Sequence, residues 1–166
     1  MQNFKTLNIA VGGLKEGEHR FEYKINELYF EESGYFEIKK GNFNVKVDLL
    51  KQLNLLTLNF SINGVATVIC DRCLEELEIP VECNQRLFVS FGEHTHEQTD
   101  EIFVLARNEQ ELALWQFIYE YIILSLPIIR SHPEGQCDPE QEKKIEELKP
   151  RDNHSDPRWD ALKNLQ

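Results

Sequence analysis

Alternation of apolar and polar residues is the feature that most constrains the fold of this chain of 166 residues. From residue 5 to about residue 106 the alternation has a period of two, broken by turn residues, which indicates strands that bury one face. Three runs show it clearly, and their apolar positions are Phe21, Tyr23 and Ile25, then Phe43, Val45 and Val47, then Leu56, Leu58, Phe60 and Ile62. The pattern predicts a mainly antiparallel, partly barrel-like sheet.

Two turn signals fall inside this region. Asn63-Gly64 stands between two apolar runs, and both residue types tolerate the positive φ of a type I′ turn, so the pair predicts a hairpin. The returning strand would occupy residues 65–70, with Cys70 at or near its end. Asp71-Arg72 would then form the next reversal of the chain.

After residue 106 the apolar spacing becomes helical. Asn108 followed by Glu111 resembles a capping box, and Pro127 stops the recurrence, so we predict one long helix over residues 109–125, packed on the sheet. Its apolar stripe consists of Leu112, Trp115, Tyr119, Ile122 and Leu126. Residues 139–149 have the composition of a short solvated helix.

A last helix is predicted over residues 156–165. Asp156 would be its N-cap and Pro157 its first residue, and Trp159, Leu162 and Leu165 would form an apolar edge that needs a cover. The predicted fold class is therefore α+β: a mainly antiparallel, partly barrel-like sheet, one long helix packed on it and a helical C-terminal tail. We divide the chain into a β-rich core, residues 1–130, and a tail, residues 131–166.

Charge restricts the partners of this protein. The formal net charge is −11, and residues 1–130 carry 12 Lys and Arg against 20 Asp and Glu, while residues 131–166 carry 6 against 9. Neither part has the basic surplus that drives nonspecific binding to nucleic acid. Direct nonspecific nucleic-acid binding is therefore disfavoured, and a basic protein is the easier electrostatic match.

The sequence predicts a cytoplasmic location. Its first twenty residues lack a charged start followed by an unbroken apolar run, and the longest apolar stretch, residues 114–129, carries Glu120. We therefore expect neither a signal peptide nor a membrane anchor. Thiols stay reduced in the cytoplasm, so the cysteines are expected to bind metal, to catalyse or to pack, and not to form a structural disulfide.

Cys70 and Cys73 form a CxxC motif, which is half of a tetrahedral zinc site. His132 and Cys137 would supply the other half and tie the end of the long helix to the hairpin tip. A thiol-exchange role is disfavoured because the surroundings are antiparallel strands and because Asp71 and Glu75 would raise a thiol pKa. Half-buried packing thiols remain the alternative, and Cys83, in phase with Ile79 and Val81, is predicted to be a core residue.

Other catalytic or ligand motifs are weak. His94 and His96, near Asp100, lie in a polar loop where a metal site is a minor alternative. The pairs Glu31/Glu32 and Glu75/Glu76 are typical of solvated faces. No GxSxG, Walker or GxGxxG motif is present, so a binding protein is favoured over an enzyme.

The run "CDRCLEELEIPV" resembles the CxRCL signature of the YceD family of large ribosomal RNA subunit accumulation proteins. The opening "LKEGEHRFEYKI", the helix ending "LSLPI" and the closing "DPRWDALKNL" match that family in the same order. The resemblance implies an accessory factor for accumulation or processing of large-subunit (23S) ribosomal RNA or for ribosome assembly. It also implies zinc, with the family's second cysteine cluster reduced here to His132 and Cys137.

The resemblance further implies contacts with a ribosomal large-subunit precursor or a basic ribosomal protein. Arg72, in the signature, and Asp156 and Arg158, in the closing motif, are the candidate contacts, together with Trp159 on the apolar edge. For Arg72 the alternative is a surface ion pair with Asp71 or Glu75. A zinc- or thiol-dependent enzyme and a purely structural interaction module remain the rival functions.

Overall fold

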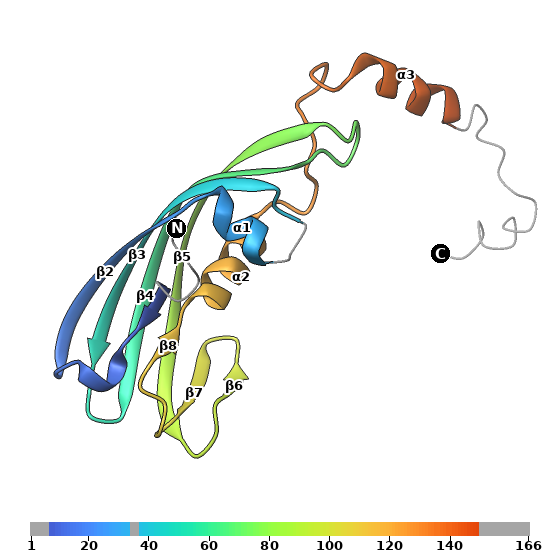
Figure 1. The fold of residues 1–166 in the computed structure, drawn as a ribbon. Helices are drawn as coiled ribbons and strands as arrows, with labels where there is room; N and C mark the ends of the chain where they lie inside the picture. Colours follow the sequence, from blue (N-terminus) through green and yellow to red (C-terminus); the bar gives the residue numbers. More distant parts are fainter. Residues whose placement is uncertain (1–6, 34–36, 150–166) are drawn as a thin grey trace, which may run out of the picture.

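The computed structural model describes residues 7–33 and 37–149 as a curved sheet with two helices on one side (Figure 1). The strands of the main sheet lie in the order β2-β3-β4-β5-β7-β6, and all neighbours are antiparallel except the parallel pair β5 and β7. These strands are β2 (Gly17–Ile25), β3 (Lys40–Lys51), β4 (Leu55–Ile69), β5 (Glu76–Gly92), β6 (His96–Thr99) and β7 (Ile102–Ala106). Two further strands, β1 (Asn8–Ile9) and β8 (Leu112–Ala113), pair separately. A single turn of 3-10 helix, η2 (Val11–Gly13), follows β1.

The sheet does not close into a barrel, so the partly barrel-like prediction was wrong. Among the described residues, β2 and β6 are its two edges, and β6 has only four residues, all of them exposed. Alternation identifies the buried face of each strand, but closure depends on strand tilt and on the stagger between strands, which alternation does not encode. The buried face is covered instead by helices.

β4 runs straight through Asn63-Gly64, so the predicted hairpin there was wrong. Gly64 pairs with Phe43 on one side and with Val81 on the other. A Cβ atom on Gly64 would lie 2.1 Å from the carbonyl oxygen of Asn42 and 2.5 Å from a ring carbon of Phe43. Glycine is therefore needed at this position for the close approach of a neighbouring strand and not for a turn.

The reversal between β4 and β5 comes at Asp71-Arg72, as predicted. Residues 71–73 form the turn, and Ile69 pairs with Glu76 across it. β4 and β5 have 15 and 17 residues, well beyond the usual strand length. This turn consequently lies at the tip of a long hairpin that extends past the two helices on the sheet (Figure 1).

Helix α2 (Trp115–Ser125) covers the buried face of the sheet and begins six residues later than predicted. Leu112 and Ala113 pair with β1 as strand β8, which takes the backbone groups that a helix from residue 109 would use. The Asn108–Glu111 capping box is therefore not formed, and Leu114 is the N-cap. The end of the helix agrees with the prediction, because Leu126 is extended before Pro127.

The core lies between the sheet and the helices. The largest fully buried side chains come from both layers and include Phe30, Leu58, Phe60, Ile62 and Leu105. Helix α1 (Glu27–Ser33) covers β3 beside α2, and the Tyr29 hydroxyl donates a hydrogen bond to the Trp115 carbonyl. The two helices are thus joined to each other as well as to the sheet.

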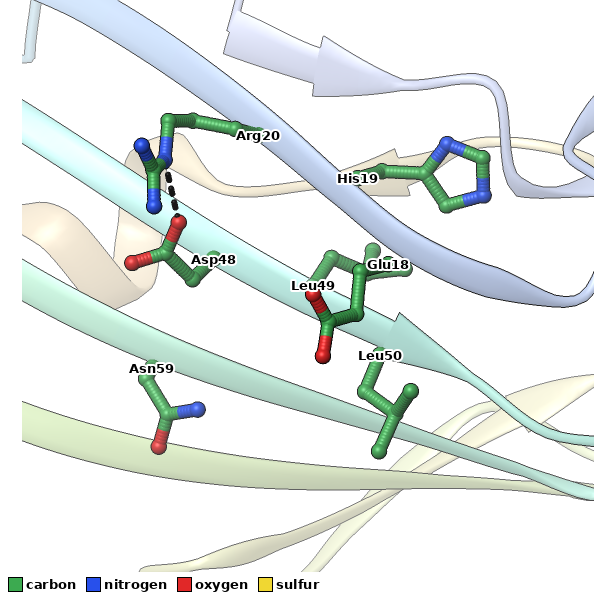
Figure 2. Close-up of a pocket in the computed structure, with 7 residues that line it drawn as sticks. All are labelled: Glu18, His19, Arg20, Asp48, Leu49, Leu50 and Asn59. Carbon is green, nitrogen blue, oxygen red and sulfur yellow. Dashed lines mark hydrogen bonds and ion pairs between the residues drawn. The ribbon is translucent and has the colours of Figure 1, made fainter.

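The opposite face of the sheet is polar. It carries a hollow of about 500 Å³, where Arg20 of β2 pairs with Asp48 of β3 at 2.6 Å. Figure 2 shows the side chains that line the hollow. The two side chains are 70% and 53% exposed, so water weakens their attraction, and each already neutralises the other. The Arg20–Asp48 pair therefore leaves no net charge in this hollow that would attract a ligand.

Helix α3 (Pro139–Leu148) stands away from the sheet and has no buried residue (Figure 1). This confirms the short solvated helix predicted over residues 139–149. The predicted helix over residues 156–165 lies outside the described residues, and the division at residue 130 stays a prediction. Within residues 7–33 and 37–149, none of the helices combines the length and apolar character needed to cross a membrane.

Candidate metal centre

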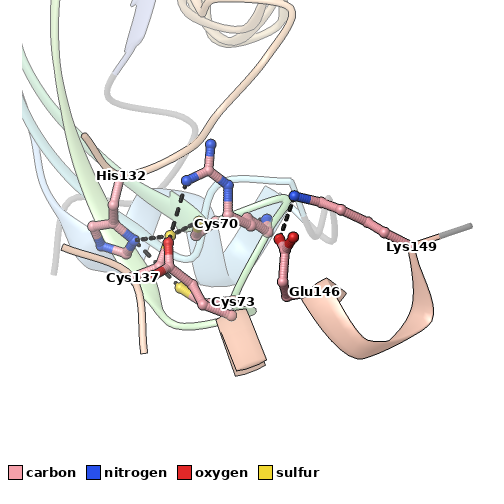
Figure 3. Close-up of polar contacts among 8 residues, drawn as sticks. Cys70, Cys73, His132, Cys137, Glu146 and Lys149 are labelled. Atoms are coloured by element: carbon pink, nitrogen blue, oxygen red, sulfur yellow. Dashed lines mark hydrogen bonds and ion pairs between the residues drawn. The ribbon is translucent and has the colours of Figure 1, made fainter. Parts of the chain in front are cut away.

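Four side chains from two distant parts of the sequence converge at the hairpin tip. The ligand atoms of Cys70, Cys73, His132 and Cys137 all lie within 4.8 Å of one another (Figure 3). The sequence predicted this set, and the structure brings all four residues together. All four cysteines of the chain are free thiols, and the fourth, Cys83, lies elsewhere in the core.

The distances suit a tetrahedral zinc ion. With Zn–S bonds of 2.3 Å, two sulfurs are roughly 3.8 Å apart, and a sulfur and an imidazole nitrogen are roughly 3.5 Å apart. The Sγ atoms of Cys70 and Cys137 are 3.9 Å apart. His132 Nδ1 lies 3.4 Å from Cys73 Sγ and 4.0 Å from Cys137 Sγ. These three distances between ligand atoms are therefore close to those around a tetrahedral zinc ion.

Local backbone geometry places the two cysteines of the CxxC motif. Cys70 follows the last residue of β4, and its N–H donates to the Glu75 carbonyl at 2.9 Å. The Leu74 N–H donates to the Cys70 carbonyl at 3.0 Å, and the Arg72 N–H points at the Cys70 sulfur at 3.5 Å. Leu74 has a φ of 66°, a conformation that is costly for a branched side chain. This turn thus directs the sulfur atoms of Cys70 and Cys73 towards the same point.

The second pair is held against this turn by Asp71. The Asp71 N–H donates to the Arg130 carbonyl at 2.7 Å, and the Arg130 N–H donates to Asp71 Oδ2 at 2.7 Å. These reciprocal bonds, which we call the Asp71–Arg130 clamp, fix the chain two residues before His132. The clamp was not predicted from the sequence, although an Asp in a turn is a common acceptor for backbone N–H groups.

The orientation of the His132 ring is also fixed. Its Nε2 lies 3.2 Å from the Glu76 carbonyl oxygen, so this nitrogen carries the proton and donates. Nδ1 is then the unprotonated nitrogen and faces the sulfurs. A backbone carbonyl behind a histidine ligand is a common way to orient the ring and raise its basicity. No sequence signal could have identified this carbonyl.

Cys137 leads directly into α3. Asp138 caps the helix by accepting from the N–H groups of Glu140 and Gln141. An ion pair of 3.4 Å between Arg72 and Glu142 then joins the turn to the helix. The four candidate ligands therefore connect three segments: the β4–β5 turn, the chain after α2, and α3.

The thiols of the cluster differ in acidity. Burial raises the pKa of Cys70, but hydrogen bonds from the backbone N–H groups of Cys73, Arg72 and His132 outweigh it and lower the pKa to about 6. Burial, followed by the neighbouring Cys73 and Cys70, raises the pKa of Cys137 to about 11. A side-chain hydrogen bond between His132 and Cys70 raises the pKa of the His132 imidazole. One thiolate forms readily here, and a second and third need a cation beside them.

Burial distinguishes metal binding from thiol exchange. Cys70 is 0% exposed and Cys73 is 3% exposed, so a partner disulfide has no path to either sulfur. Cys70 also directly follows a strand of an antiparallel hairpin and does not itself begin a helix, whereas the activated cysteine of a redox CxxC motif does. Three buried thiols and an imidazole suit zinc, which favours sulfur and nitrogen ligands.

The remaining predicted residues have other roles or lie outside the described residues. Cys83 is buried in the main core, as predicted, and burial raises its pKa. His94 and His96 are exposed, and in the described part of the chain no third ligand joins them. Arg72 is exposed and pairs with Glu142 and not with Asp71 or Glu75. Its contact with a partner stays a prediction, as do those of Asp156, Arg158 and Trp159, which are not described.

Residues 58–166, more than half of the chain, match the model of one protein family, described as large ribosomal RNA subunit accumulation protein YceD. This range includes all four candidate ligands. Searches of curated proteins and of solved structures gave no match.

Proposed function

Because the chain belongs to the YceD family of large ribosomal RNA subunit accumulation proteins, we propose that it is an accessory factor for the accumulation of large-subunit (23S) ribosomal RNA. We propose that it acts by binding a partner and not by catalysis, and that it works in the cytoplasm. The family match is the observation that carries this proposal, since it covers residues 58–166 and the whole cluster.

Cys70, Cys73, His132 and Cys137 would hold one structural zinc ion. Four protein ligands complete a tetrahedral shell, whereas a catalytic zinc keeps a position for water or substrate. The ion would supply the positive charge that three buried thiolates need. In this role it fixes the turn after β4 against α3 and so sets the surface that carries Arg72.

A zinc- or thiol-dependent enzyme is the second candidate. The observation in its favour is the pKa of Cys70, which the backbone N–H groups lower to about 6 after burial has raised it. A nucleophilic thiolate must also reach its substrate, and Cys70 is fully buried. The closed ligand set and this burial support the structural role over the catalytic one.

The expected partner is a large-subunit precursor, contacted through a basic ribosomal protein. A net charge of −11 opposes direct binding to phosphates and favours a basic protein surface. Such a contact is sensitive to salt because charges at a protein surface are screened over roughly 10 Å at 0.1 M.

The test is sedimentation of a cell lysate on a density gradient, with each fraction probed for the protein and for 23S ribosomal RNA. We expect the protein to comigrate with large-subunit precursors at low salt and to leave them at high salt. Deleting its gene should lower the ratio of 23S to 16S ribosomal RNA, and the wild-type gene should restore it. A protein that stays at the top of the gradient, in a deletion strain with an unchanged ratio, would overturn the proposal.

Cys70→Ser separates the two candidate functions. A structural zinc predicts that the variant loses metal and thermal stability together, since metal-binding free energy is also folding free energy. An enzyme predicts that the variant keeps its fold and stability but fails to restore 23S ribosomal RNA in the deletion strain.

A further inference from the structure

A small pocket lies beside the N-terminus of α2, away from the metal centre. It has a volume of about 140 Å³, roughly the share of four or five waters. Cofactor and drug-like sites usually need about 300 Å³ or more, so the pocket fits a single side chain better. Its lining comes from β6, β7, β8, α2 and the loops beside these elements.

Aromatic rings form one part of its lining. Phe103 of β7 and Phe117 of α2 meet edge to face, with ring centres 5.2 Å apart, and Trp115 lies at the start of the same helix. Phe103 and Trp115 are only partly buried. The faces of such rings carry partial negative charge and attract cations within about 6 Å.

Carboxylates form the other part. Glu97 from β6 and Glu109 and Glu111 from the loop before β8 line the pocket and are exposed. The lining contains no Lys, Arg or His, and no ion pair of the described residues involves these three carboxylates. Their negative charge is therefore unmatched within the described part of the chain.

Neutral donors hold two of these carboxylates in place. The Ala106 N–H donates to Thr95 Oγ1 at 2.9 Å, and that hydroxyl donates to Glu109 Oε1 at 2.7 Å. The Asn8 side-chain amide donates to Glu111 Oε2 at 3.0 Å. Each bond occupies one carboxylate oxygen and leaves the other available. The site is thus preorganised without being neutralised, which lowers the entropy lost when a ligand binds.

Tyr121, one turn after Phe117 on α2, lies in the same negative field. Burial raises its pKa, and the charges of Glu120, Glu97 and Glu101 raise it further, to about 12. Its hydroxyl is buried and has no hydrogen-bond partner among the described residues. The pocket therefore combines aromatic surface with negative charge, and none of the described residues that line it is a cation.

We propose that this pocket binds a lysine or arginine side chain of a basic protein partner. Aromatic faces would contact the apolar stem and the cationic group, and Glu97 and Glu109 would accept charge-assisted hydrogen bonds from it. The inference deepens the proposed function and rests on it for the setting in which that partner is met.

Binding is tested by NMR on the full chain carrying Trp159→Phe, which leaves Trp115 as the sole tryptophan. The probes are the Nα-acetyl methylamides of arginine and lysine, with the citrulline derivative as the uncharged counterpart of arginine. We expect saturable shifts of the Trp115 indole and Gln116 amide signals with the two cations, and at least fivefold weaker binding of citrulline. Equal binding of citrulline, or shifts that do not saturate, would overturn the inference.

Two matched variants test the role of the carboxylates. Glu97→Gln/Glu109→Gln should weaken arginine binding at least fivefold, while Glu18→Gln/Glu22→Gln, which changes the net charge equally on the exposed side of β2, should leave it unchanged. The amide spectrum away from the changed residues reports that each variant is folded. An equal loss of binding in both variants would assign the effect to net charge and overturn the pocket.

Sedimentation separates a failure of the pocket from a failure of the proposed function. If the wild-type pocket binds arginine but the protein never comigrates with large-subunit precursors, the proposed function fails and the pocket stands. If the protein comigrates but the pocket binds no cation, the pocket fails alone. If both hold, Glu97→Gln/Glu109→Gln must reduce comigration, and unchanged comigration would overturn the pocket's role in partner binding.

Discussion

The sheet core and the metal end of this molecule are stabilised in different ways. In the sheet core, apolar side chains of β2–β5 pack against α1 and α2, and residues such as Leu58 and Phe60 are at most 1% exposed. In the metal end, which we define as residues 70–76 and 128–148, the buried cluster consists of three cysteines with Leu77 packed against it. Hydrophobic burial stabilises the core, whereas the metal end has little of it, and the proposed zinc ion would supply the missing bonds.

Exposure supports the same contrast. Leu124 near the end of α2, and Ile128 and Ile129 at the start of the second segment of the metal end, are 77%, 98% and 74% exposed. α3 contributes no buried residue. With so little apolar area to bury, the metal end gains little from the hydrophobic effect, so its order depends on the ligands, the clamp and the ion pair. Changes in the core should affect the whole molecule, and changes in the metal end should act locally.

Phe60→Ala should have the largest effect on global stability. Phe60 is 1% exposed and meets Tyr121 of α2 edge to face at 5.2 Å, so its truncation leaves a cavity between the two layers. We expect a loss of about 3–5 kcal/mol in the free energy of unfolding, measured by urea denaturation. Ser61→Ala, the next residue on the polar face of β4, should change it by less than about 0.5 kcal/mol.

Cys73→Ser should disorder the metal end while the sheet core stays folded. Losing one of four ligands removes most of the metal-binding free energy, so we expect bound zinc to fall from about one per chain to nearly none. Hydrogen exchange at residues 70–76 and 130–148 should speed up about 100-fold, or by about 3 kcal/mol, with β3 amides unchanged. Cys83→Ser is the control, because Cys83 lies in the sheet core, and this variant should bind as much zinc as the wild type. Equal loss of protection across the sheet would contradict the division into two regions.

Tyr121 makes the core sensitive to alkali. Its pKa is raised to about 12 by burial and by neighbouring carboxylates, against 10.0 normally. The unfolded chain therefore loses this proton first, so the stabilisation is full below pH 10 and is lost as pH rises towards 12. We expect a loss of about 2 kcal/mol over that window, less than the full shift implies because solvent screens the charges of the exposed carboxylates Glu97 and Glu101. Urea denaturation at a series of pH values measures this loss in the free energy of unfolding. Tyr121→Phe, which has no ionisable hydroxyl, should not show it.

These contrasts also explain which parts of the fold could be predicted from sequence. A strand with one buried face leaves a period-two pattern, so the strands around Phe43 and Phe60 were predicted correctly. Asn63-Gly64 was misassigned because glycine serves both tight turns and close strand approach, and only the position of Phe43 decides between them. The start of α2 was misplaced because pairing of β8 with β1, far away in sequence, overrides the local helical signal.

The candidate metal site also has parts that the sequence predicts and parts that it does not. Cysteine and histidine reveal the ligands by residue type, so all four were named from the sequence. The Asp71–Arg130 clamp and the Glu76 carbonyl behind His132 depend on backbone groups, which every residue has, and on how two distant segments approach. The acidic pocket was also missed, because Phe103, Trp115 and Glu97 come from three separate elements.

Asp71→Ala tests how much the clamp contributes to the metal end. The change removes the charged acceptor for the Arg130 N–H, and we expect a local loss of about 1.5 kcal/mol and roughly tenfold weaker zinc binding. Asp71→Asn keeps an oxygen acceptor without the charge and should recover part of both. Competition with a zinc chelator measures the affinity. Unchanged affinity in Asp71→Ala would mean that the ligands alone hold the two segments together.

Arg72→Gln should have the smallest effect on stability and is the sharpest test of function. The Arg72–Glu142 ion pair spans 3.4 Å, and its side chains are 40% and 36% exposed, so we expect a change of under about 0.5 kcal/mol in the free energy of unfolding. Zinc content should stay the same. Reduced comigration with large-subunit precursors would then report a lost partner contact. Glu142→Gln breaks the same ion pair while keeping the arginine, so comigration that falls equally in both variants would assign the effect to the position of α3 and not to Arg72.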